Sequence, residues 1–234
     1  NGILALEYLK ALKRLSSTMQ VLPVKREGSH HNSTEEGGPL VSASLIRSRL
    51  REGKDIRPYV PASTTAYLPD SFWSEERFFR ALQFSLVSHE RDTLARIDEV
   101  AEGLENRISA CALTAGSYRE LVDSIRSRRY PASRIQRILL NSLLYIRSDR
   151  KEALGFSLGP SYIRVLGCRP DSRDLLGQLK KNSSLPCVIK PSDDLKALPP
   201  LSLSAFQDEL RFSRIYAFLN DTAPANELTL GLLS

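Results

Sequence analysis

The stretch from Ser42 to Gly53, SASLIRSRLREG, combines residue types and spacing suited to holding an anion. Ser44 is expected to cap a helix, because its hydroxyl can accept a hydrogen bond from a backbone N–H of the first turn, and Gly53 is expected to end it. The N–H groups at a helix start favour negative charge. The hydroxyls of Ser42 and Ser44 and the guanidinium of Arg47 could add contacts to a phosphate. The pattern predicts a phosphate site, with an ordinary capped surface helix as the alternative.

A second group of candidates is the window from Ile125 to Arg150, where seven arginines face one acid, Asp149. Its net charge of +6 equals the excess of 33 basic over 27 acidic residues in the whole chain. Such a concentration is typical of a surface that binds a phosphate backbone. The alternative is a solvated helix face whose arginines pair with acids elsewhere in the fold. The candidates for nucleic-acid contact are Arg126, Arg128, Arg129, Arg134 and Arg137, together with Tyr130.

Tyr130 lies within this basic window and allows two interpretations. Its ring could stack on an unpaired base. The alternative is an aromatic residue of the core or of a helix cap.

The elements that position the first site alternate between helix and strand. Residues 1–14 have helical apolar spacing, Met19–Val24 is expected to form a strand, and Glu27–Pro39 is expected to be a glycine-containing loop. Lys25 and Arg26 follow the strand, at the end where open α/β sheets bind ligands. The order of helix, strand, basic strand end, loop and anion-ready helix predicts the second half of a nucleotide-binding α/β domain.

The remaining sequence predicts mostly helices after a proline-containing linker. An aromatic helix over Phe72–Val87 is expected to face a core rather than a ligand. Ser117 and Glu120 form a capping-box pattern, and Ser133 is expected to cap a helix over Arg134–Ile146. Further helices are expected over 93–101, 103–113, 118–126, 174–181 and 205–219. Residues 161–167 are expected to form a strand-like run or a buried turn, and residues 187–190 a strand-like run.

Composition limits the class of protein. A chain of 234 residues with 41% hydrophobic and 26% charged residues is typical of a soluble globular protein, expected in the cytoplasm. No apolar run approaches the roughly 18–20 residues that span a bilayer. The three cysteines, Cys111, Cys168 and Cys187, are expected to be free thiols, and neither they nor the histidines have the spacing of metal ligands.

Several stretches of the sequence resemble the bacterial tRNA(Met) cytidine acetate ligases of the nucleotidyltransferase superfamily with a His-x-Gly-His motif. The resemblance runs through the chain in order. It rests on NGILALEYLKAL, PVKREG, VSASLIR, EGLENR, SRRYPASRIQRILLN, YIRVLG, SLPCVIKPS and ELRFSRIYAFL.

The resemblance implies a fold and an activity. The fold would be an α/β remnant of a Rossmann-like nucleotidyltransferase domain (residues 1–56), a linker (57–69) and a mostly α-helical, tRNA-binding domain (70–234). The activity would be ATP-dependent acetylation of the wobble cytidine of elongator tRNA-Met through acetyl-adenylate, with Mg²⁺ carried on the ATP phosphates. The ATP contacts would be Asn1, Arg26, Glu27, Ser42, Ser44 and Arg47.

The chain also departs from the family pattern. It contains no His-x-Gly-His stretch, which is expected upstream of Asn1, and the loop after Arg26 reads GSHHN where a Tyr-His pair is usual. We therefore expect the activity to belong to a longer parent, and no catalytic residue is assigned. The alternatives are a small-molecule adenylyltransferase and a non-catalytic RNA-binding fragment.

Overall fold

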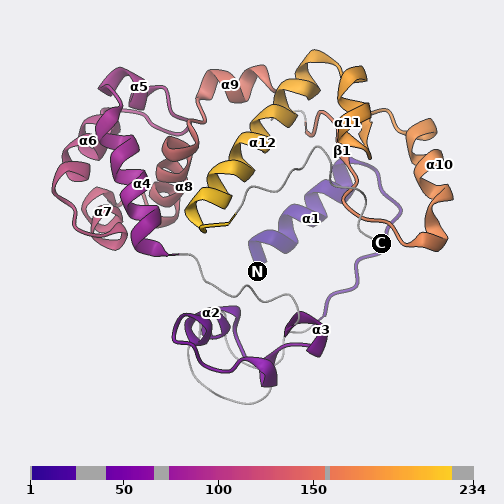
Figure 1. The fold of residues 1–234 in the computed structure, drawn as a ribbon, viewed down its shortest axis with the longest axis horizontal. Helices are drawn as coiled ribbons and strands as arrows, with labels where there is room; N and C mark the ends of the chain where they lie inside the picture. Colours follow the sequence, from indigo (N-terminus) through magenta and orange to yellow (C-terminus); the bar gives the residue numbers. More distant parts are fainter. Residues whose placement is uncertain (1, 25–40, 66–73, 156–158, 223–234) are drawn as a thin grey trace. The chain divides into compact units, whose positions relative to one another are not determined.

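The computed structural model describes residues 2–24, 41–65, 74–155 and 159–222 (Figure 1). The chain divides into two compact units, Asn1–Phe72 and Trp73–Ser234. The described parts are mostly helical, with one small two-stranded parallel sheet.

Helix α1, Gly2–Arg14, opens the first unit and confirms the helix expected over residues 1–14. None of its residues is buried, and Ile3 and Tyr8 are 82% and 63% exposed. Lys13 and Arg14 lie in the last turn, where the helix dipole favours positive charge.

The strand predicted over Met19–Val24 is wrong for this structure. These residues lie in neither helix nor strand, and Leu22 and Val24 are both 86% exposed. A strand needs a neighbouring strand to accept and donate its backbone hydrogen bonds. Within the described ranges no segment pairs with this stretch, so its apolar composition is not enough to make it a strand.

The rest of the first unit is a small helical cluster formed by α2 (Ala43–Arg51), η1 (Arg57–Tyr59) and α3 (Ala62–Thr65). Leu45 and Ile56 are buried there, at 5% and 3% exposure. The predicted linker, residues 57–69, therefore contains two short helical turns.

A helical bundle forms the first part of the second unit. Its apolar core includes the fully buried Leu82, Leu86, Ile108 and Ile135. The bundle consists of α4 (Glu75–Ser88), α5 (Arg91–Ala95), α6 (Leu104–Thr114), α7 (Tyr118–Ile125) and α8 (Ala132–Leu144).

The aromatic residues of α4 are only partly in the core. Phe78 and Phe79 are buried, as expected, whereas Phe84 is 75% exposed. Ser74 caps the helix by accepting a hydrogen bond from the Arg77 N–H at 3.2 Å. Phe72 and Trp73 lie outside the described residues.

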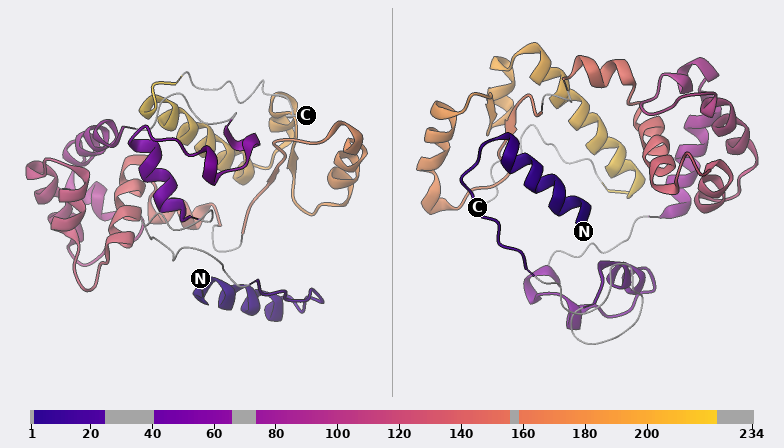
Figure 2. Two further views of the ribbon diagram at one scale, coloured as in Figure 1. Left: turned by 90° about the horizontal axis from the view of Figure 1, so that it is seen from below. Right: turned by 180° about the vertical axis from the view of Figure 1, so that it is seen from behind.

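The second part of the unit contains the sheet and a long terminal helix. Strands β1 (Ile163–Arg164) and β2 (Cys187–Val188) pair in parallel, which confirms both strand-like runs. In Figures 1 and 2 the bundle forms one end of this unit and α10 the other, with α9 and α12 between them. The remaining elements are α9 (Ser148–Ala153), η3 (Pro170–Ser172), α10 (Asp174–Asn182), α11 (Pro191–Asp194), η4 (Leu195–Ala197) and α12 (Pro200–Leu219).

Three predicted helix boundaries need correction. The helix expected over 93–101 ends at Ala95, because Ile97 instead forms an antiparallel bridge with Arg147. Pro131, not Ser133, precedes α8 as its N-cap residue. Helix α12 begins at Pro200 rather than at Ala205, because proline is well suited to a first helical position.

Candidate nucleotide and RNA sites

The predicted phosphate site lies at the start of α2, and the structure corrects its cap. Ser42, not Ser44, is the N-cap: it is 2% exposed and its Oγ accepts a hydrogen bond from the Leu45 N–H at 3.1 Å. The Ser42 hydroxyl therefore stabilises the first turn of the helix. Gly53 follows the helix with a φ of +65°, as expected for a glycine stop.

Ser44 and Arg47 lie one turn apart at this helix start. Arg47 is exposed, and its Nη2 donates to Ser44 Oγ at 3.4 Å, which is long for a hydrogen bond. A weak contact of this kind leaves the guanidinium able to turn toward an anion. The other candidates for ATP contact, Asn1, Arg26 and Glu27, lie outside the described residues.

The second candidate site is the basic edge of the bundle, which we define as Arg126, Arg128, Arg129, Arg134 and Arg137. The side chains of Arg126, Arg129 and Arg137 are 58%, 69% and 57% exposed, and that of Arg134 is 35% exposed. Arg128 is also exposed and forms no ion pair with any described residue. The edge is therefore open to solvent.

Acids of the bundle pair with most of the arginines of this edge. Glu99 lies 2.7 Å from Arg137 and 3.4 Å from Arg134, and Glu102 pairs with Arg129. Asp123 lies 3.3 Å from Arg126. These pairs agree with the alternative of a solvated helix face whose arginines pair with acids. The three carboxylates offset three of the five positive charges of the edge.

Two of the pairs are bidentate. Arg137 donates through Nε and Nη2 to the two oxygens of Glu99, at 2.7 and 2.8 Å, and Arg129 contacts both oxygens of Glu102 through Nη1 and Nη2. The guanidinium of Arg137 lowers the pKa of the Glu99 carboxyl below its ordinary value. The sequence offered no local signal for these pairs, because Glu99 and Glu102 precede the arginine window.

Tyr130 is a core residue in this structure, which agrees with the core interpretation of its ring. It is 8% exposed, its hydroxyl donates to the Ala101 carbonyl at 3.1 Å, and the Arg134 guanidinium lies over its ring at 4.7 Å. A buried ring covered by an arginine offers no free face to a base. Its contribution is to hold the loop before α6 against the bundle.

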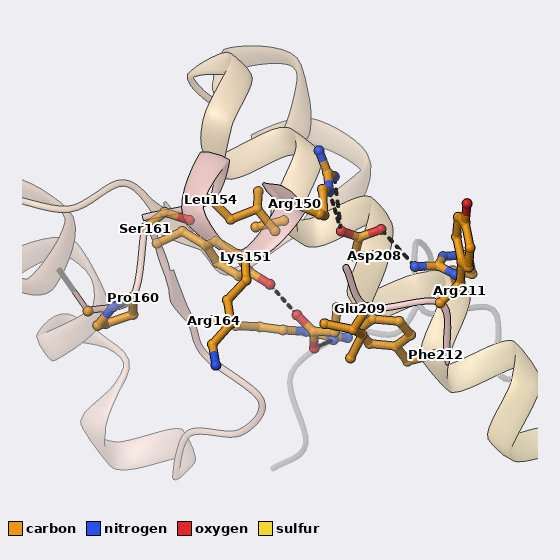
Figure 3. A pocket seen from close by; sticks show the side chains of 15 residues that line it. Arg150, Lys151, Leu154, Pro160, Ser161, Arg164, Asp208, Glu209, Arg211 and Phe212 are labelled. Carbon is orange, nitrogen blue, oxygen red and sulfur yellow. Dashed lines mark hydrogen bonds and ion pairs between the residues drawn. The ribbon is translucent and has the colours of Figure 1, made fainter. Parts of the chain in front are cut away.

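A cavity of about 630 Å³ lies beside α9 and α12 in the second unit, and sequence reasoning missed it. Arg150 and Arg211 both reach the Asp208 carboxylate, at 2.9 and 3.2 Å (Figure 3). Asp208 is only 18% exposed. We define Arg150, Asp208 and Arg211 as the α9–α12 joint, because the contacts connect these two helices.

Three further properties of the described residues concern metal ligands, cysteines and membrane helices. Among the described residues, no group of three or more His, Cys, Asp or Glu side chains is placed to hold a metal ion. The three cysteines are free, as expected. In the same part of the chain, no helix is both long and apolar enough to cross a membrane.

The sequence matches known proteins along most of its length. Residues 1–229 match the family described as HIGH Nucleotidyl Transferase. Two curated relatives are tRNA(Met) cytidine acetate ligases. That of Acetivibrio thermocellus is 33% identical over 228 residues, covering 92% of this chain and 55% of the relative. That of a Thermoanaerobacter species is 36% identical over 224 residues, covering 92% and 54%.

The fold of the chain is also similar to that of solved structures. The apo crystal structure (form I) of Thermotoga maritima TmcAL superposes with a TM-score of 0.83 at 25% identity, covering all of this chain and 60% of the other. A second structure of that protein, bound with alpha-thio ATP, gives 0.78 at 26% identity, covering 99% and 56%. The chain thus spans about half the length of the curated relatives it matches. With a family match over residues 1–229, this chain belongs to the HIGH nucleotidyl transferase family.

Proposed function

We propose that this chain is part of an enzyme that acetylates the wobble cytidine of elongator tRNA-Met with acetate and ATP. The observation that carries the proposal is the similarity to tRNA(Met) cytidine acetate ligases, which extends over 92% of the chain at 33–36% identity. Since the chain covers about half of these relatives, the activity is proposed for the whole protein.

The reaction has two steps. A carboxylate oxygen of acetate attacks the α-phosphorus of ATP, the bond from that phosphorus to the bridging oxygen breaks, and pyrophosphate leaves. The exocyclic amine of cytidine then attacks the acetyl carbonyl carbon, loses a proton, and AMP leaves. Both steps depend mainly on positioning and on positive charge near the phosphates.

The start of α2 is our proposed phosphate contact for ATP. The backbone N–H groups of the first turn and the hydroxyl of Ser44 favour an anion there. Arg47 would exchange its long contact with Ser44 for a charge-assisted one with a phosphate oxygen. Asn1, Arg26 and Glu27 would complete the site, and Mg²⁺ would be carried by the ATP phosphates, which suits its preference for phosphate oxygens and water.

The basic edge is our proposed tRNA contact. Three of its arginines, Arg126, Arg129 and Arg137, are more than half exposed, and arginine recognises phosphate through paired N–H donors. Such contacts position an RNA on the surface without reading its sequence. Tyr130 takes no part, because its ring is buried.

Incubation of the protein encoded by the complete gene with ATP, labelled acetate and a tRNA-Met transcript tests the proposal. We expect label on the wobble cytidine, with AMP and pyrophosphate as products. Transfer of AMP to a small phosphate-bearing acceptor, with no tRNA label, would instead favour a small-molecule adenylyltransferase. RNA binding without turnover of ATP would favour a non-catalytic RNA-binding role.

The ATP contact has its own test in the same full-length protein. We expect Arg47→Ala to slow acetate-dependent pyrophosphate release by about 100- to 1,000-fold, the scale for removing one donor to transition-state charge. Arg51→Ala, an exposed arginine in the last turn of the same helix, is the control and should be near wild type. Equal rates for the two variants would contradict a phosphate role for Arg47.

A further inference from the structure

The carboxylates of Glu99 and Glu102 resemble bound phosphates in how they meet the basic edge. Each presents two oxygens to the fork of one guanidinium, Glu99 to Arg137 and Glu102 to Arg129. A phosphodiester presents two non-bridging oxygens to the same fork, and arginine binds carboxylate and phosphate in this bidentate way. The two positions are therefore already shaped for phosphates.

The loop that carries the two acids is held in an unusual conformation. Glu99 and Glu102 have φ values of +69° and +59°, in the left-handed region that residues with a side chain seldom adopt. Such a conformation persists where surrounding contacts maintain it. Here the contacts come from α8 and the turn before it: Tyr130 donates to the Ala101 carbonyl, and Arg134 donates to the Glu99 carbonyl at 3.4 Å.

The acids do not fully satisfy the donors that they face. Arg134 Nε is buried, and although Glu99 Oε2 lies 3.4 Å away, this nitrogen finds no hydrogen-bond acceptor among the described residues. A buried donor without an acceptor is unfavourable. The exposed pair of Arg129 and Glu102 is of a class that contributes little to stability. A phosphate that replaces Glu99 would therefore satisfy Arg134 Nε, and one that replaces Glu102 would displace an ion pair that contributes little to stability.

We propose that Glu99 and Glu102 act as internal phosphate mimics, which occupy two phosphate subsites of the RNA surface in the free protein and are displaced by the RNA backbone. The inference rests on the proposed RNA contact at the basic edge. One subsite is formed by Arg134 and Arg137, and the other by Arg129 with the neighbouring exposed Arg128. An RNA binds with full affinity only when its phosphates reach both subsites. Polyanions whose charges reach only one subsite are therefore bound less tightly.

The test compares charge-neutral variants of the same size. We expect Glu99→Gln and Glu102→Gln each to bind a tRNA-Met transcript about two- to fivefold more tightly at ~0.1 M salt, the scale of an exposed ion pair. The slope of log affinity against log salt should change little, because the same arginines contact phosphates in the bound state of wild type and variant, and these contacts release the counterions of the RNA. Fluorescence anisotropy between ~50 and 200 mM salt measures both.

The matched control is Glu105→Gln, which makes the same charge change three residues away, at an acid that accepts from Asn106 and forms no ion pair with a described residue. An equal gain in affinity for this control would overturn the proposal, because charge alone would then explain the effect. Unchanged or weaker binding of both Glu99→Gln and Glu102→Gln would also overturn it, and would identify the pairs as structural.

Different variants test whether folding is disturbed and whether the basic edge binds RNA at all. Glu102 is 50% exposed, so Glu102→Gln tests the idea even where the loss of the two Glu99 pairs disturbs the bundle. If Arg128→Ala plus Arg129→Ala weakens RNA binding while the glutamine variants bind as wild type, the mimic role fails and the RNA contact stands. If none of these variants changes RNA binding, the RNA contact itself fails, and the mimic role with it.

Discussion

Two arginine-rich regions of the second unit form their ion pairs in different surroundings. At the basic edge, Arg129 and its partner Glu102 are 69% and 50% exposed. At the α9–α12 joint, Asp208 is 18% exposed, and the two arginines that donate to it, Arg150 and Arg211, are 38% and 41% exposed. Arg211 also donates to the Leu144 carbonyl at 2.7 Å, which connects α12 to the end of α8.

The difference in exposure distinguishes ion pairs that a ligand can replace from ion pairs that stabilise the fold. Solvent screens an exposed pair, which therefore contributes little to stability and is readily replaced by a ligand. Removing Asp208 from the partly buried joint leaves two guanidinium groups without their shared counter-charge, which costs more. Arginine content alone does not distinguish the two regions.

The largest expected effect is at the joint. Asp208→Asn should lower the free energy of unfolding by about 1–3 kcal/mol, because Arg150 and Arg211 lose a shared charged acceptor. Urea denaturation measures the change. Asp171→Asn, which removes the exposed partner of Arg169, is the control and should cost less than about 0.5 kcal/mol. If both variants lost the same free energy of unfolding, the joint would contribute no more to stability than an exposed ion pair.

The next effect is at the basic edge and concerns binding rather than stability. Arg128→Ala plus Arg129→Ala should weaken tRNA binding about three- to tenfold at ~0.1 M salt and reduce the salt slope by about 1–2. The double variant Arg169→Ala plus Arg173→Ala removes two exposed arginines elsewhere in the unit and serves as the charge-matched control. Unchanged affinity across several salt concentrations would exclude this edge as the RNA contact.

A smaller effect is expected at Tyr130, which lies beneath the edge. Tyr130→Phe should cost about 0.5–1.5 kcal/mol of unfolding free energy, since it removes the hydrogen bond to Ala101. tRNA affinity should not change, because the ring is buried. A variant that keeps its thermal stability but binds RNA less well would show that Tyr130 contacts the RNA.

The smallest effect is a pH dependence at Glu99. The pKa of its carboxyl is lowered from an ordinary value of 4.5, chiefly by the hydrogen bond from Arg137. The stabilisation is therefore present above pH 4.5 and is lost as the pH falls through the lowered pKa. The stability difference between wild type and Glu99→Gln should be constant above about pH 5 and shrink in acid. A constant difference down to pH 3 would contradict a role for the Glu99 charge.

Local patterns predicted much of the helical structure. The capping pattern at Ser117 and Glu120 is confirmed: Ser117 Oγ accepts from the Glu120 N–H at 3.1 Å, and Glu120 accepts from the Gly116 N–H at 2.9 Å. Helices α1, α6 and α10 also agree with their predicted ranges to within about two residues at each end. Caps and apolar spacing depend on residues within one or two turns, so the sequence contains them directly.

These local patterns did not predict contacts between distant segments of the chain. The partners of Arg129 and Arg137 lie 27 and 38 residues earlier in the chain, so the excess charge of the window did not predict its compensation. The Met19–Val24 prediction failed for a related reason, since a strand depends on a partner that local composition does not specify.

The sequence by itself determined much of the helical structure, the glycine stop after α2, the free thiols and the family. Only the tertiary structure decided which serine caps α2, that Tyr130 is buried, and which arginines are paired. The physical reason is range: propensity and capping act between neighbours along the chain, whereas burial and ion pairing depend on which distant segments the fold brings together.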